Sequence, residues 1–136
     1  MAVSGGRDST ALLHATVHAA RPLGIAVHAL HVHHGLQAPA DAWARQVRAQ
    51  CRRWGAHFHL ARLSGAPAAA ESVEAWARRE RYAALSQMAH AQGCGIVLLA
   101  HHRRDQAETV LLQLMRGGGA RGLAAMPARA EREGVT

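Results

Sequence analysis

The first ten residues constrain the fold of this chain most, because an apolar segment, a turn of small residues and a helix start follow one another directly. Met1 to Val3 are apolar, residues 4–9 read Ser-Gly-Gly-Arg-Asp-Ser, and the stretch from Ala11 to Val17 carries apolar residues at helical spacing. This order predicts a strand, a tight loop and a helix. Such a loop directs several backbone N–H groups to one point, and the first helical turn adds unpaired donors and the positive end of the helix dipole. We therefore expect an anion site, with phosphate as the anion.

The residue types of this loop suit such a site. Gly5 and Gly6 allow positive φ and a close approach of the ligand, and the hydroxyls of Ser4 and Ser9 add donors. The Asp8 carboxylate fits once a divalent cation is present, because it can hold Mg²⁺ against the phosphates. A simpler interpretation stays open, in which the loop is only a turn and a helix cap. A Walker-type loop is excluded, since it needs a lysine and the chain has none.

Two motifs together resemble one family. The first loop is similar to the S-G-G-x-D-S pyrophosphate loop of the N-type ATP pyrophosphatases. Residues 100–109, Ala-His-His-Arg-Arg-Asp-Gln-Ala-Glu-Thr, and the glycine-rich residues 116–127 resemble the signature of the tRNA(Ile)-lysidine synthetases, specifically of their N-terminal catalytic domain. Segments 31–36 and 77–82 are similar to the same family. The motifs follow the family's order over essentially the whole chain.

The expected fold is α/β. Strand-like and helix-like segments alternate, which predicts a parallel sheet covered on both faces. The resemblance implies an adenine nucleotide alpha-hydrolase-like, Rossmann-like domain of three αβα layers, with strand order 3-2-1-4 and a fifth strand beyond residue 136. We expect one PP-loop ATP-binding domain over residues 1–136, as a fragment truncated at both ends.

The apolar patterns and the turn residues predict where the individual elements lie. The expected helices cover about 8–20, 41–54, 72–92 and 104–116. The expected strands cover about 1–3, 25–32, 57–63 and 95–100. Residues 95–100 form the clearest buried strand, and the last helix is expected to turn Val110, Leu111, Leu114 and Met115 toward the core.

Polar residues follow three of the expected strands, and the carboxyl ends of parallel strands gather ligands. These are the first loop, the pair His33-His34, and the segment from His101 to Glu108. Asp105 and Glu108 are three residues apart, so they share a helix face. Two carboxylates there can hold Mg²⁺, act as a base or bind an amino group. The alternative is ordinary helix chemistry, with an acid in the first turn and a solvated glutamate; the first loop next to them favours a functional site.

The resemblance assigns roles to individual residues. The loop that holds the pyrophosphate end of ATP, with Asp8 as the Mg²⁺ ligand, is matched by Ser4, Gly5, Gly6, Arg7, Asp8 and Ser9. The catalytic motif that handles cytidine and lysine is matched by His101, Asp105 and Glu108. The positions that line the tRNA cleft are matched by Arg78, Arg81, Arg116 and Arg121. Two residues depart from the family pattern: Arg7 replaces a small or apolar residue, and Arg104 often a second aspartate.

The resemblance also implies a reaction with ATP and Mg²⁺. ATP adenylates the 2-carbonyl oxygen of the wobble cytidine in the anticodon loop of tRNA(Ile), and free lysine then displaces AMP to give lysidine. One alternative is another N-type ATP pyrophosphatase of the tRNA thiolation type, but such enzymes often carry C-x-x-C cysteines, which this chain lacks. The other is a non-catalytic nucleotide-binding module, which would explain the first loop without needing His101, Asp105 and Glu108.

Composition sets the remaining expectations. The net charge is +7 and all sixteen basic residues are arginine, which favours a polyanionic partner, although GC-rich coding bias also enriches arginine. Cys51 and Cys94 have no zinc or C-x-x-C spacing, so reduced thiols and a cytoplasmic location are expected. The eleven histidines lack zinc-enzyme spacing. No apolar run suggests a membrane span. The oligomeric state, a homodimer included, stays open.

Overall fold

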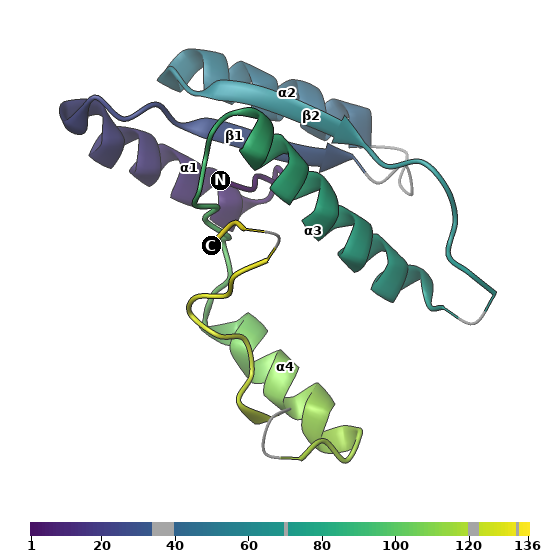
Figure 1. Cartoon of the computed structure of the whole chain (residues 1–136). Coiled ribbons are helices and arrows are strands. Elements are labelled where there is room, and N and C mark those ends of the chain that lie inside the picture. Colours follow the sequence, from purple (N-terminus) through teal and green to yellow (C-terminus); the bar gives the residue numbers. More distant parts are fainter. Residues whose placement is uncertain (34–39, 70, 120–122, 133) are drawn as a thin grey trace.

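The computed structural model of the chain describes residues 1–33, 40–69, 71–119, 123–132 and 134–136 (Figure 1). Helices and strands alternate through most of it, as the sequence predicts. In chain order the elements are α1 (Arg7–Ala20), the short 3₁₀ helix η1 (Arg21–Leu23), β1 (His28–His33), α2 (Ala40–Trp54), β2 (His57–Arg62), α3 (Val73–Ala91) and α4 (Arg103–Met115).

Local signals fixed the helix starts well. α3 begins after Ser72, whose Oγ accepts a hydrogen bond from the N–H of Ala75 at 3.1 Å. All four predicted helices are present within two residues of the expected bounds. The second strand is shorter than predicted: β1 begins at His28, because Ile25 still bonds back to the Ala20 carbonyl and is 59% exposed.

The sheet is parallel. β1 and β2 pair in register from His28 opposite His57 to His33 opposite Arg62. On the other side of β1 lies the first segment of the chain, where the N–H of Val3 donates to the Leu30 carbonyl at 2.9 Å. This places the start of α1, directly after that segment, in the middle of the sheet.

The regular sheet contains only β1 and β2, and residues 1–3, expected to be a strand, join it through a single bridge between Ala2 and Leu30. Two further segments lie beside residues 1–3 in the same layer. The N–H of Ala2 donates to the Leu98 carbonyl at 2.9 Å, and the N–H of Thr136 donates to the Gly95 carbonyl at 3.0 Å. The spatial order is therefore 3-2-1-4, as the resemblance implied. The resemblance implied a fifth strand beyond residue 136. In the structure Thr136 already bonds to Gly95 and Val97, on the side of residues 95–98 that faces away from residues 1–3.

Helices cover both faces of the sheet, because successive side chains of a strand point to opposite sides. Ala29 belongs to a core that α1 and α2 build with Leu13, Val17, Val47 and Cys51. The next residue, Leu30, faces a second core with Leu85 and Ala89 of α3. The predicted α/β architecture with three layers is thus confirmed.

The fourth strand differs from expectation. Residues 95–100 run beside Ala2 but form no regular strand, and Ile96 and Leu98 are 67% and 42% exposed. Val97 and Leu99, which point to the opposite face, pack against the α3 core. One face of this segment is therefore covered and the other is not.

The orientation of α4 explains the difference. Figure 1 shows this helix set apart from the sheet, and α4 has no buried residue. Leu111, Leu114 and Met115 are 58%, 53% and 85% exposed, so the prediction that they face the core is wrong. The apolar pattern of α4 marks an apolar face, but nothing among the described residues covers it. None of the helices described in the structure is long and apolar enough to cross a membrane.

Stability should depend on the core under α1 and not on α4. We expect Leu13→Ala, at a position with 0% exposure, to lower the free energy of unfolding by about 2–5 kcal/mol. Leu111→Ala on the exposed face of α4 is the matched control and should change it by less than about 0.5 kcal/mol. Urea unfolding followed by circular dichroism measures both; equal losses would contradict the packing described here.

Candidate functional site

The first loop is held closed by its own serines. The Ser9 hydroxyl donates to the Gly6 carbonyl at 3.0 Å and accepts from the N–H of Ser4 at 3.2 Å. The two hydroxyl oxygens are 3.0 Å apart. Because the Ser9 proton is directed to the Gly6 carbonyl, the Ser4 hydroxyl is the donor between them. Both hydroxyl protons are therefore used within the loop. Ser4 and Ser9 also line the pocket described below, so the expectation that they offer hydroxyl donors to a ligand stays a prediction.

Backbone groups are the donors that the loop does leave available. The N-cap of α1 is Gly6, which provides no side-chain cap for the N–H groups of the first turn. Gly5 has φ of +94°, a conformation that favours glycine, and a Cβ there would lie 3.4 Å from Cβ of Trp43. The backbone thus approaches α2 closely while the positive end of α1 opens outward, which is the arrangement an anion site requires.

A histidine connects this loop to the start of α4. His102 Nε2 lies 3.7 Å from Oδ2 of Asp8, and His102 Nδ1 lies 3.3 Å from Oδ2 of Asp105. The N–H of Asp105 donates to Nδ1 at 3.3 Å, so Nδ1 is the acceptor and Nε2 carries the proton in neutral His102. The N–H of this imidazole therefore lies on the side of Asp8.

Asp105 has two roles in this arrangement. Its Oδ2 accepts the N–H of His102 at 2.8 Å, and the reciprocal bond to the His102 ring completes a capping box for α4. The interpretation of Asp105 as a helix-terminal acid is therefore correct as far as it goes. The same carboxylate also lines the pocket described next, and a carboxylate can accept hydrogen bonds on both oxygens.

A pocket of about 260 Å³ lies between the two helix starts. Its polar lining combines the first loop, the end of the fourth segment and one arginine of α3. The loop contributes Gly6, and the polar side chains that line the pocket are those of Ser4, Asp8, Ser9, Arg81, His101, His102 and Asp105. The structure thus brings together the sites that the sequence placed after the first and the fourth strands.

Partial burial and a neighbouring positive charge lower the pKa of His101. Burial is the largest cause, the Arg81 guanidinium adds to it, and the Asp105 carboxylate opposes it. The imidazole of His101 consequently stays neutral at pH 7. A neutral ring can donate through one nitrogen and accept through the other.

The other predicted site residues lie elsewhere. Glu108 and Arg116 are exposed on α4, Arg7 is exposed on α1, and none of the three lines either pocket. Arg78 lines a larger neighbouring pocket. His33 is buried, with Nε2 3.3 Å from Oδ1 of Asp41, and is not part of the site. The positions of His34 and Arg121 lie outside the described residues.

Sequence reasoning passed over His102. The family motif assigns a role to His101, the first residue of the His-His pair, and none to His102. The available signal was the spacing of His102 and Asp105, since a polar residue followed three positions later by an acid is typical of a capping box. What no spacing could predict is the contact with Asp8, which is far away in the sequence.

The effect of the Arg81 charge on the pKa of His101 can be tested. We expect Arg81→Ala to raise the pKa of His101 toward its ordinary value of 6.5, because one charge that opposes protonation is removed. Because the folded-state pKa lies below 6.5, stability linked to His101 is full above that pH and falls as the pH drops through the folded-state pKa. NMR titration of the ring measures the pKa. Arg79→Ala, at a guanidinium paired with Glu71 and Glu80, is the control and should leave it unchanged.

Comparison with known proteins shows which sequences this chain is similar to. The chain is 50% identical over 135 residues to a tRNA(Ile)-lysidine synthase of Bordetella pertussis, covering 99% of this chain and 42% of that protein. A tRNA(Ile)-lysidine synthase of Pseudomonas syringae pv. tomato is 52% identical over 126 residues, covering 91% of this chain and 27% of that protein. The chain thus spans less than half the length of these curated relatives. They confirm the resemblance seen in the motifs.

A solved structure supports the fold alone. The U34-tRNA thiolase NcsA from Methanococcus maripaludis matches with a TM-score of 0.80 at 16% identity, covering 99% of this chain and 48% of that one.

The model of the PP-loop domain family matches residues 1–136. Because this match covers the whole sequence, the chain belongs to the PP-loop domain family, and membership implies that it binds ATP.

Proposed function

We propose that this domain is the catalytic part of a tRNA(Ile)-lysidine synthetase. It would use ATP to activate the wobble cytidine of tRNA(Ile) for attack by free lysine, in the cytoplasm. The observation that carries the proposal is the shared pocket, in which the anion-binding start of α1 faces the His101, His102 and Asp105 group at the start of α4. The names of the relatives, each a tRNA(Ile)-lysidine synthase, support the choice of substrate.

The first loop suits the pyrophosphate end of ATP. Its uncapped N–H groups and the dipole of α1 supply positive potential without a lysine. We assign Mg²⁺ to the carboxylate of Asp8, whose side chain is 67% exposed. No three His, Cys, Asp or Glu side chains of the described residues gather into a metal site, so phosphate and water oxygens would complete the shell, as is usual for this ion. When bound, Mg²⁺ offsets the charge that develops on departing pyrophosphate.

The carboxylates of α4 suit the second reactant. Asp105 lines the pocket and can bind the ammonium group of lysine and orient it after deprotonation. We assign Glu108, one helical turn further along the exposed face, to the approach of the same cation. His101, kept neutral by burial and by Arg81, can hydrogen-bond the cytidine or accept a proton from the amine.

Arginine side chains around the pocket suit the RNA. Arg81 lines the same pocket as the loop, and Arg78 lines the neighbouring one. We assign Arg116 and Arg121 to the same RNA cleft on the basis of the family motif. Guanidinium groups are effective phosphate ligands because of their planar, bidentate geometry.

The whole reaction tests this function. We would incubate full-length protein with labelled lysine, ATP and tRNA(Ile), and measure label in RNA together with pyrophosphate. The proposal predicts incorporation only when all three reactants are present, with one pyrophosphate released for each lysine incorporated. Release of pyrophosphate without RNA, or transfer of sulfur in place of lysine, would contradict it.

A further inference from the structure

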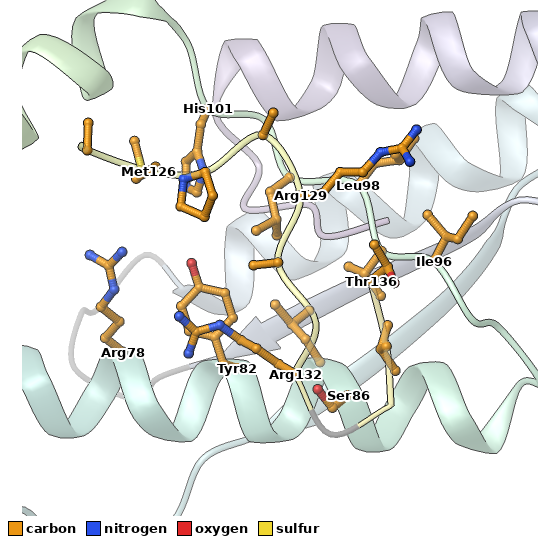
Figure 2. A pocket seen from close by; sticks show the side chains of 18 of the residues that line it. Arg78, Tyr82, Ser86, Ile96, Leu98, His101, Met126, Arg129, Arg132 and Thr136 are labelled. Carbon is orange, nitrogen blue, oxygen red and sulfur yellow. The ribbon is translucent and has the colours of Figure 1, made fainter. Parts of the chain in front are cut away.

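A second, larger pocket lies beside the first one. It has a volume of about 960 Å³ and shares Leu85, Leu99 and His101 with the smaller pocket. Figure 2 shows Arg78, Tyr82 and Arg132 grouped on the side of α3, with His101 and Met126 across from them. A ligand bound here would therefore contact His101, which also lines the smaller pocket beside the Ser4–Ser9 loop.

The lining of the larger pocket has one sign of charge. Arg78, Arg129 and Arg132 contribute to it, and among the residues that the structure describes none of those lining it has an acidic side chain. Residues 96–99 add apolar surface to the same lining, and Figure 2 shows Leu98 beside Arg129. Positive groups next to apolar surface suit a ligand that is both anionic and flat, such as a nucleotide. The same lining disfavours a free lysine, whose side chain is cationic.

Tyr82 organises the arginines of this pocket. The guanidinium carbon of Arg132 lies 4.5 Å from the centroid of the Tyr82 ring, and those of Arg78 and Arg81 lie 5.9 and 5.8 Å from it. Arg78, Tyr82 and Ser86 recur every four residues along α3, so they lie on one face of the helix. The ring thus contacts Arg132, which comes from a segment fifty positions further along the chain.

We propose that the Tyr82–Arg132 pair is a positioning site for the RNA substrate, and that the larger pocket binds the nucleotide presented for modification and its flanking phosphates. The inference rests on the proposed function and adds residues to it. An arginine plane fixed on an aromatic ring loses little side-chain entropy on binding, and single-stranded RNA bases stack on such planes. Arg78 and Arg129 provide the phosphate contacts.

The two pockets thereby separate the reactants by charge. The loop before α1 binds the phosphates of ATP, and the carboxylates of Asp8 and Asp105 attract the cations Mg²⁺ and lysine. The three arginines of the larger pocket bind the RNA. His101 belongs to both linings and lies where the nucleotide meets ATP. A second molecule of ATP in the larger pocket is the competing occupant that the experiment must distinguish.

The test measures RNA and ATP binding separately on full-length variants. Fluorescence anisotropy with an anticodon stem–loop RNA of tRNA(Ile) gives one affinity, and calorimetry with Mg-ATP gives the other. We expect Arg132→Ala and Tyr82→Ala each to weaken RNA binding about tenfold, as expected for the loss of one stacked base. For Arg132→Ala the slope of log affinity against log salt should also fall by about one. Tyr82→Phe, which keeps the ring, should bind RNA normally, and Mg-ATP binding should be unchanged in all three variants.

Arg48→Ala is the matched control. It removes another exposed arginine that lies over an aromatic ring, 5.2 Å from the centroid of Phe58, and it makes the same change in net charge. Equal effects of Arg48→Ala and Arg132→Ala on RNA binding and on its salt slope would overturn the proposal. So would a loss of Mg-ATP affinity in Arg132→Ala with RNA affinity unchanged, which would assign the pocket to ATP. A wild-type protein that binds ATP but transfers no lysine to RNA would instead overturn the proposed function.

Discussion

Asp8→Ala is expected to lower the rate of ATP consumption by at least about 100-fold, because it removes the carboxylate that we propose to hold Mg²⁺ at the first loop. The side chain is 67% exposed and its contact with His102 is long, at 3.7 Å, so the substitution should leave the fold intact. Pyrophosphate release in the presence of tRNA(Ile) and lysine measures the rate, and circular dichroism verifies the fold.

Asp41→Ala is the control for this prediction. Asp41 is a similarly exposed carboxylate at the start of α2, paired with Arg62 at 2.7 Å, and it does not line the pocket. Its loss should leave ATP consumption unchanged, and because the ion pair is exposed to solvent it should have little effect on stability. Normal ATP consumption by Asp8→Ala would show that the Mg²⁺ assignment is wrong.

Asp105→Asn should separate ATP binding from lysine transfer. Asparagine keeps an oxygen that can accept the N–H of His102, so the cap of α4 is preserved while the negative charge in the pocket is lost. We expect unchanged Mg-ATP affinity and a fall in lysine incorporation of about 100-fold or more, the contribution typical of a positioned acid–base group. Filter assays with labelled lysine measure the transfer.

Glu108→Gln tests the second carboxylate and should show the same separation of ATP binding from lysine transfer. Glu74→Gln is the control, since Glu74 is an exposed acid in the first turn of α3, away from the pocket. Full lysine transfer by Glu108→Gln would remove Glu108 from the site. Full transfer by Asp105→Asn would leave Asp105 only its role as a helix cap.

The part of the site that the sequence predicted depends on short-range features. The loop from Ser4 to Ser9 and the start of α1 are encoded within a few residues, since two glycines and the following apolar spacing leave few alternatives. The same holds for the cap of α3 at Ser72. Parallel strand ends meet at one edge of a sheet, so the convergence of this loop with His101 and Asp105 also followed from the order of elements.

The wrong predictions concern which element packs against an apolar surface. Residues 95–100 were predicted to be buried because they are apolar, yet Ile96 and Leu98 are exposed. The apolar residues of α4 were predicted to face the core, yet none of them is buried. Periodicity identifies the apolar face of an element but carries no information about which element packs against it. Long-range contacts such as His102 with Asp8, or Arg132 with Tyr82, are beyond sequence patterns for the same reason.

The position of the phosphates of bound ATP tests the central claim most directly. A crystal structure with Mg²⁺ and a non-hydrolysable ATP analogue should show the terminal phosphates against the backbone N–H groups at the start of α1, with Mg²⁺ on Asp8. Asp105 and His102 should line the same cavity. Phosphates bound away from the Ser4–Ser9 loop, for example among the arginines beside Tyr82, would contradict it.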